Sequence, residues 1–81
     1  MNVILTGPAQ KDINALAPLV KKRVQKELVN IASGNARLEK LAEPPPRWKV
    51  RVGEYRIVLT LDASRATATI LKVKHRREVY R

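Results

Sequence analysis

Residues 48–59 read Trp-Lys-Val-Arg-Val-Gly-Glu-Tyr-Arg-Ile-Val-Leu, and this stretch decides the fold. Apolar residues alternate with Lys49, Arg51 and Arg56, which is the period of two expected for half-buried strands. Gly53-Glu54 lies between the two alternating runs and fits a tight hairpin turn. We therefore predict two antiparallel strands, with apolar residues on one face and the three cations together on the other.

The sequence after this hairpin continues the sheet. Residues 62–65 (Asp-Ala-Ser-Arg) form a turn cluster, and residues 66–73 are rich in β-branched side chains, which favours a third strand. Residues 77–80 are expected to form a short final strand. Before the hairpin, residues 35–47 form a connector, in which Pro44-Pro45-Pro46 imposes an extended and stiff approach.

Two helices are expected before the connector. Residues 3–5 are a short apolar run that indicates a strand and ends at Gly7-Pro8. Pro8 and Pro18 each suit the first turn of a helix, and Ser33-Gly34-Asn35 is a stop signal. In the second helix, apolar residues recur at helical spacing at Val20, Val24, Leu28 and Ile31. We therefore predict an α+β fold, with two N-terminal helices packed on one face of a small antiparallel β-sheet, as a single domain spanning residues 1–81.

The charge distribution indicates an anionic partner. The 81 residues include 17 Lys/Arg against 7 Asp/Glu, a formal net charge of +10. Residues 47–81 hold ten of these cations and three of the acids, a balance of +7, while residues 1–46 hold seven and four, a balance of +3. Nucleic acid is the first candidate and an acidic protein the second. An anionic membrane is disfavoured, because the cations lie on predicted strands rather than on an amphipathic helix.

The residues that several classes of chemistry require are absent from this sequence. The chain has no cysteine, a single histidine and scattered carboxylates, so we expect no disulfide and no metal site. Gly7, Gly34 and Gly53 are isolated, and no Gly-rich phosphate loop is present. We expect no cofactor. The N-terminus shows neither a signal-peptide pattern nor a long apolar run, which predicts a cytoplasmic protein without a membrane partner.

The sequence resembles the RelE/ParE-superfamily toxins, in particular the RelE-like branch. The resemblance is most specific in residues 48–59 and in residues 73–81 (Val-Lys-His-Arg-Arg-Glu-Val-Tyr-Arg). The resemblance covers nearly the whole chain and implies the RelE-like microbial RNase-type fold. It implies the toxin of a type II toxin–antitoxin pair, held inactive by a cognate antitoxin. RelE-type members cleave mRNA in the ribosomal A site, whereas ParE-type members poison DNA gyrase. Promoter DNA is expected to be contacted only indirectly, through the antitoxin.

The resemblance also assigns roles to individual residues. It implies a catalytic set formed by Lys49, Arg51, Arg56, Arg76 and Tyr80. Arg51 stands where RelE enzymes often have a second lysine. The tail has fewer residues between Arg76 and Tyr80 than in the best-known RelE enzyme, and many small RelE-like sequences end this way. Further cations and the histidine are expected to bind RNA, namely Arg47, Lys74, His75, Arg77 and Arg81.

These residue types suit RNA cleavage by the 2′-hydroxyl group. A guanidinium pairs with two phosphate oxygens, so Arg56 and Arg76, supported by Arg51, are expected to stabilise the charged phosphorane. Either Lys49 or Tyr80 is expected to act as the base, and the sequence leaves the choice open. Tyr80 has the alternative role of stacking on a nucleobase. Because a set of cations is a modest catalyst for free RNA, we expect the ribosome to position the mRNA.

Two other functions remain open on the same fold. The first is a ParE-like DNA gyrase inhibitor. The second is a non-catalytic toxin homologue that acts only in a repressor complex. On pattern alone, alternating cations on a strand are also compatible with an ordinary solvated face, and Tyr80 with a packing role. The charge asymmetry and the hairpin and tail favour an mRNA endonuclease (mRNA interferase).

Overall fold

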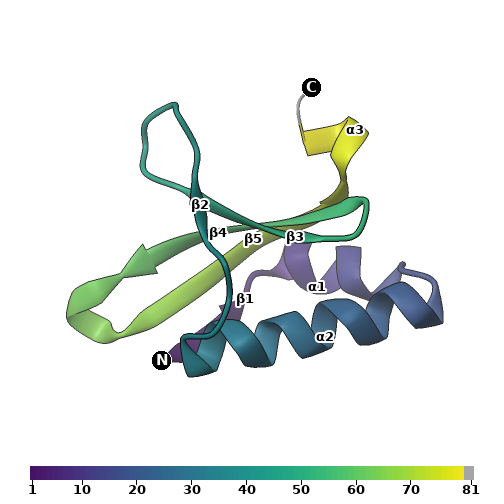
Figure 1. Ribbon diagram of the computed structural model, residues 1–81, viewed down its shortest axis with the longest axis horizontal. Helices are drawn as coiled ribbons and strands as arrows, with labels where there is room; N and C mark the ends of the chain where they lie inside the picture. The colour runs from purple at the N-terminus through teal and green to yellow at the C-terminus, as the bar shows by residue number, and fades with distance from the viewer. Residues whose placement is uncertain (80–81) are drawn as a thin grey trace.

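A five-stranded sheet with the strand order β1-β5-β4-β3-β2 organises the chain. The computed structural model describes residues 1–79. The chain forms a strand, two helices, and then the rest of the sheet with a final short helix (Figure 1). The elements are β1 (Asn2–Leu5), α1 (Gly7–Asn14), α2 (Pro18–Ser33), β2 (Glu39–Lys40), β3 (Trp48–Val52), β4 (Tyr55–Asp62), the 3-10 turn η1 (Ala63–Arg65), β5 (Thr67–His75) and α3 (Arg76–Val79).

The two N-terminal helices begin at the predicted prolines, and α2 ends at the predicted stop signal, whereas α1 already ends at Asn14. The Thr6 side chain caps α1 by accepting a hydrogen bond from the Ala9 backbone N–H at 3.2 Å. Pro18 occupies the first turn of α2, and Gly34 ends that helix in the left-handed conformation, with φ of 81°. The buried residues of α2 are Val24 and Ile31, both on the predicted apolar stripe.

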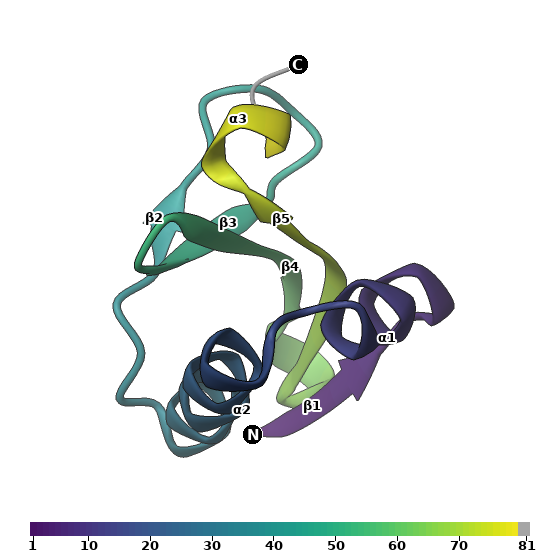
Figure 2. The same ribbon diagram turned by 90° about the vertical axis from the view of Figure 1, so that its right-hand side faces the viewer.

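The apolar residues of the hairpin form the core against α1 and α2. Val50 pairs with Ile57, which in turn pairs with Val73 across β4 and β5. These three residues are almost fully buried, together with Leu59 and Ile70. Figure 2 shows α1 and α2 on one side of the sheet, with α3 and the loop between β2 and β3 on the other. The predicted α+β architecture is confirmed.

The structure corrects three details of the sequence-based fold. Residues 76–79 are helical and not part of a final strand, because the β4–β5 ladder ends at Tyr55–His75 and leaves no partner strand. Glu39–Lys40 forms a short strand within the predicted connector. The outermost pair, β1 with β5, is parallel, so the sheet is mostly rather than wholly antiparallel. Within residues 1–79, no helix combines the length and apolar character needed to span a bilayer.

Candidate functional site

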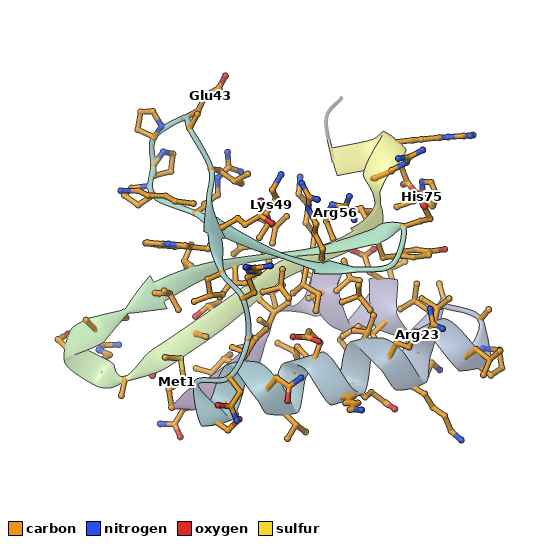
Figure 3. All side chains as sticks on the ribbon, viewed as in Figure 1. Met1, Arg23, Glu43, Lys49, Arg56 and His75 are labelled. Carbon is orange, nitrogen blue, oxygen red and sulfur yellow. The ribbon has the colours of Figure 1, made fainter. Side chains whose placement is uncertain are left out.

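Strand register gathers the hairpin cations on the side of the sheet away from α1 and α2. Lys49 pairs with Val58, and Arg51 pairs with Arg56, so these side chains project from one face. Figure 3 shows Lys49 and Arg56 pointing away from the two helices, between the β2–β3 loop and α3. The predicted common face is therefore confirmed. We call it the basic face; by register it carries Glu39, Lys49, Arg51, Arg56, Val58, Lys72 and Lys74.

Arg56 is not a solvated cation, although the alternating pattern is compatible with one. Only 8% of its surface is exposed, because β4 lies between β3 and β5 and its neighbours flank the side chain. Its Nη1 donates hydrogen bonds to the Gly53 carbonyl at 3.0 Å and to the Tyr55 carbonyl at 2.9 Å. Its Nε is buried and finds no acceptor among residues 1–79. The guanidinium is thus held in place, and its buried Nε is an unsatisfied donor within the described residues.

Arg51 and Arg76 are paired with carboxylates on the rim of the basic face. Arg51 Nε lies 3.3 Å from Glu39 Oε1, and Arg76 Nε lies 2.8 Å from Glu54 Oε2. The Arg76 backbone N–H also donates to the Glu54 carbonyl at 2.7 Å, which fastens α3 to the hairpin turn. Both arginine side chains remain more than half exposed. An anion can therefore replace either carboxylate at small cost.

Lys74 is directed toward α1 by an ion pair. Its Nζ donates to Asp12 Oδ1 at 2.9 Å, while Asp12 Oδ2 accepts from the Val73 backbone N–H at 3.0 Å. The hydrogen bond to Asp12, followed by the charge of Asp12, raises the pKa of Lys74 above its ordinary value of 10.5. This contact gives Lys74 a structural role that the sequence does not indicate.

His75 also has structural contacts. Its ring packs edge-on against Tyr55, with ring centroids 5.4 Å apart and an interplanar angle of 81°. Its Nδ1 accepts a hydrogen bond from the Arg77 backbone N–H at 3.3 Å. The ring therefore helps to join β5 to α3, and Arg77 itself is exposed.

The remaining predicted residues lie at the edges of this surface. Arg47 is half-buried just before β3, and its Nε, like that of Arg56, has no acceptor among the described residues. Lys49 is half-buried in the middle of the basic face. Tyr80 and Arg81 lie outside the described residues, so the reach of the tail tyrosine stays a prediction.

Sequence reasoning missed two residues of the basic face. Glu39 belongs to the unpredicted strand β2, where it pairs in register with Lys49. Lys72 pairs with Val58 on the same face, and its alternation with Val73 in β5 was a signal that could have found it. Among residues 1–79, no group of three or more His, Cys, Asp or Glu side chains is arranged to hold a metal ion.

Comparison with known proteins gives a consistent result. Residues 3–80 match the family described as the ParE toxin of the type II toxin–antitoxin system, parDE. Toxin RelG of Mycobacterium tuberculosis is 30% identical over 86 residues, which cover 98% of this chain and 94% of RelG. The M. tuberculosis RelBE2 toxin–antitoxin complex aligns with a TM-score of 0.81 at 25% identity, covering 91% of this chain and 95% of that one. The isolated Escherichia coli RelE toxin aligns with a TM-score of 0.79 at 25% identity, covering 98% and 89%.

Proposed function

The chain belongs to the ParE toxin family of type II toxin–antitoxin systems and is RelE-like, and from this premise we propose that it is a ribosome-dependent mRNA endonuclease. The observation that carries the proposal is the basic face, where the buried Arg56 is flanked by Arg51 and lies beside the turn that anchors Arg76. Preorganised guanidinium groups suit the charge that develops on a phosphate in the transition state.

The proposed reaction uses the nucleophile that RNA itself carries. The 2′-oxygen attacks the adjacent phosphorus while the bond from phosphorus to the 5′-oxygen breaks, which leaves a 2′,3′-cyclic phosphate and a 5′-hydroxyl end. Lys49 or Tyr80 takes the proton of the 2′-hydroxyl, and a protonated group of the site supplies one to the departing oxygen. Arg56, with its fixed guanidinium, stabilises the phosphorane together with Arg51 and Arg76.

The carboxylates of Glu39 and Glu54 occupy the places that we propose for phosphate oxygens. An exposed ion pair contributes about 0–1 kcal/mol, so exchange of a carboxylate for a phosphate costs little. The ribosomal A site would position the mRNA across the basic face and supply the orientation that a cationic surface lacks.

The proposed protein partner is a cognate antitoxin. Several solved structures of similar fold are toxin–antitoxin complexes, among them the M. tuberculosis RelBE2 complex and the E. coli RelBE complex. A chain with a net charge of +10 favours an antitoxin with acidic segments. Contact with promoter DNA would come through that antitoxin, and the pair would act in the cytoplasm.

Inhibition of DNA gyrase is the second candidate. The matching family is described by its ParE toxin, and the shared fold supports either target. The pairing of Arg51 and Arg76 with carboxylates is compatible with a protein-binding surface as well. A toxin homologue active only in a repressor complex would show neither activity.

The test is to add the purified toxin to a stalled ribosome–mRNA complex and to map 3′ ends by primer extension. Arg51→Ala and Arg76→Ala are the informative variants, because both side chains are exposed and their loss should leave the fold intact. We expect A-site cleavage by the wild type and a loss of about 100-fold or more in each variant.

Arg65→Ala is the matched control. Arg65 is also an exposed arginine paired with an acid, Asp62, but it lies in the turn between β4 and β5. The Arg65→Ala variant should cleave mRNA like the wild type. Intact mRNA with folded wild-type protein would reject the proposal, and inhibition of supercoiling by the same preparation would support the gyrase alternative.

A further inference from the structure

Two lysines of β5 belong by register to the basic face but differ in their side-chain partners. Lys72 pairs with Val58 and Lys74 with Arg56, and both side chains are half-buried. Lys74 is neutralised by Asp12, whose carboxylate is only 14% exposed. Among residues 1–79, no carboxylate forms an ion pair with Lys72. Lys72 is therefore the β5 cation whose charge is available to a ligand.

The position of Lys72 extends the basic face beyond the predicted catalytic set. Glu39, Lys49, Val58 and Lys72 lie in one row across four neighbouring strands. Lys49 and Lys72 are two strands apart, so their Cα atoms are separated by about 10 Å. Val58, which is 1% exposed, lies between them and contributes no charge. Two flexible lysine side chains attached at this spacing can each contact a phosphate of one extended RNA strand.

We propose that Lys72 binds the RNA backbone beside the scissile phosphate, whereas Lys74 fastens β5 to α1. The proposal rests on the proposed function, because it names how the same face holds its substrate. The charge of Lys74 is already neutralised by Asp12, and moving Lys74 away to pair with a phosphate would leave a mostly buried carboxylate without its partner. Lys72 forms no ion pair with a carboxylate of residues 1–79, so its charge can neutralise a phosphate directly. Lys74 was predicted from the sequence to bind RNA, and Lys72 takes that role here.

The salt dependence of RNA binding tests this assignment. The ligand is a single-stranded oligonucleotide carrying 2′-O-methyl groups, which cannot be cleaved by 2′-hydroxyl attack. We expect Lys72→Ala to weaken binding and to reduce the slope of log K against log salt by about 0.7, the value for one lost phosphate contact. Lys74→Ala should leave the slope unchanged and lower the denaturant midpoint of unfolding instead. Lys72→Arg should restore the wild-type slope.

Two results with the β5 variants would overturn the proposal. One is a Lys72→Ala slope equal to that of the wild type, and the other is an equal reduction in Lys74→Ala. Lys26→Ala is the control for net charge, because Lys26 is an exposed lysine on α2, on the far side of the sheet. If it reduces the slope as much as Lys72→Ala does, the effect reflects total charge and the proposal is also wrong.

This binding experiment separates the two proposals. If Lys72 governs RNA binding while mRNA on ribosomes stays intact, the enzyme proposal fails and the Lys72 contact stands. If the toxin cleaves mRNA and Lys72→Ala binds RNA like the wild type, only the Lys72 proposal fails.

Discussion

Arg56 is a buried cation that belongs to the candidate site and also stabilises the hairpin. Its Nη1 bonds both the Gly53 and Tyr55 carbonyls, so it closes the turn that carries Glu54. Truncation to alanine removes both bonds and opens a space in the middle of the sheet. Loss of activity in Arg56→Ala would therefore mix a chemical effect with a structural one.

We expect Arg56→Ala to lower the free energy of unfolding by about 2 kcal/mol, because two turn carbonyls lose their donor. Urea unfolding followed by circular dichroism measures the change. Arg51→Ala is the control: its side chain is 59% exposed and, among residues 1–79, forms an ion pair only with the partly exposed Glu39, so its effect should stay within about 0.5 kcal/mol. Equal stabilities of Arg56→Ala and wild type would contradict the anchoring role.

Glu39→Gln should tighten RNA binding. The substitution removes a negative charge from the basic face and frees the Arg51 guanidinium, 3.3 Å away. The salt slope should steepen by up to about 0.7 as Arg51 gains a phosphate contact. Glu43→Gln, an exposed acid of the β2–β3 loop, controls for net charge. Weaker binding in Glu39→Gln would show that Glu39 orients Arg51 for the substrate and does not compete with it.

For single residues, the sequence predicts which face of the sheet a side chain lies on better than it predicts which groups surround that side chain. Alternation placed Lys49, Arg51 and Arg56 on one face correctly, because side-chain period in a strand is two. It could not show that Arg56 is buried or that Lys74 pairs with Asp12, which is 62 residues away in the chain. Both facts depend on which elements lie beside β4 and β5.

Among the elements, those with strong local signals were predictable. Pro8, Pro18 and Gly34 mark the helix ends directly. Strand β2 has only two residues and exists through its pairing with β3, so no local pattern indicates it. Helix α3 replaces the expected strand because the β4–β5 ladder ends at Tyr55–His75, and the Arg76 N–H bonds the Glu54 carbonyl, 22 residues away along the chain.

Gly34 offers a test of the helix end. Its φ of 81° lies in the left-handed region, and a Cβ there would meet nothing within 4 Å, so the cost of alanine is purely conformational. We expect Gly34→Ala to destabilise the fold by about 1 kcal/mol. Gly7→Ala is the control, since it has equal space and no positive φ, and should be neutral or slightly stabilising. Chemical denaturation of both variants measures the difference.

The Asp12–Lys74 pair, which joins α1 to β5, should make stability depend on alkaline pH. Because the folded-state pKa of Lys74 is raised above 10.5, the contribution is fully present below that pH. It is lost as pH rises through the higher folded-state value. The difference in unfolding midpoint between wild type and Lys74→Met should therefore narrow above that point. A constant difference across the alkaline range would contradict a charged pair.

For the whole molecule, the pairing of β1 with β5 joins the two ends of the chain. Thr6, at the start of α1, donates from its hydroxyl group to the Ile70 carbonyl at 2.8 Å, and the two residues are 64 apart in sequence. The sequence predicted the layers but not this parallel pair, because no short turn links the strands. The net charge of the whole chain, in contrast, follows from its composition alone.

Salt should have opposite effects on folding and on RNA binding. The chain carries 17 Lys/Arg against 7 Asp/Glu, so the cations outnumber the acids that could pair with them and repel one another. At physiological ionic strength the screening length is about 8 Å, so added salt weakens the repulsion between cations that lie farther apart than this. We expect the urea midpoint to rise with NaCl at neutral pH, while RNA affinity falls over the same range. Lys26→Glu, which lowers the net charge by two, should flatten the response of folding. A midpoint that falls with NaCl would mean that attraction within the ion pairs outweighs the repulsion among the cations.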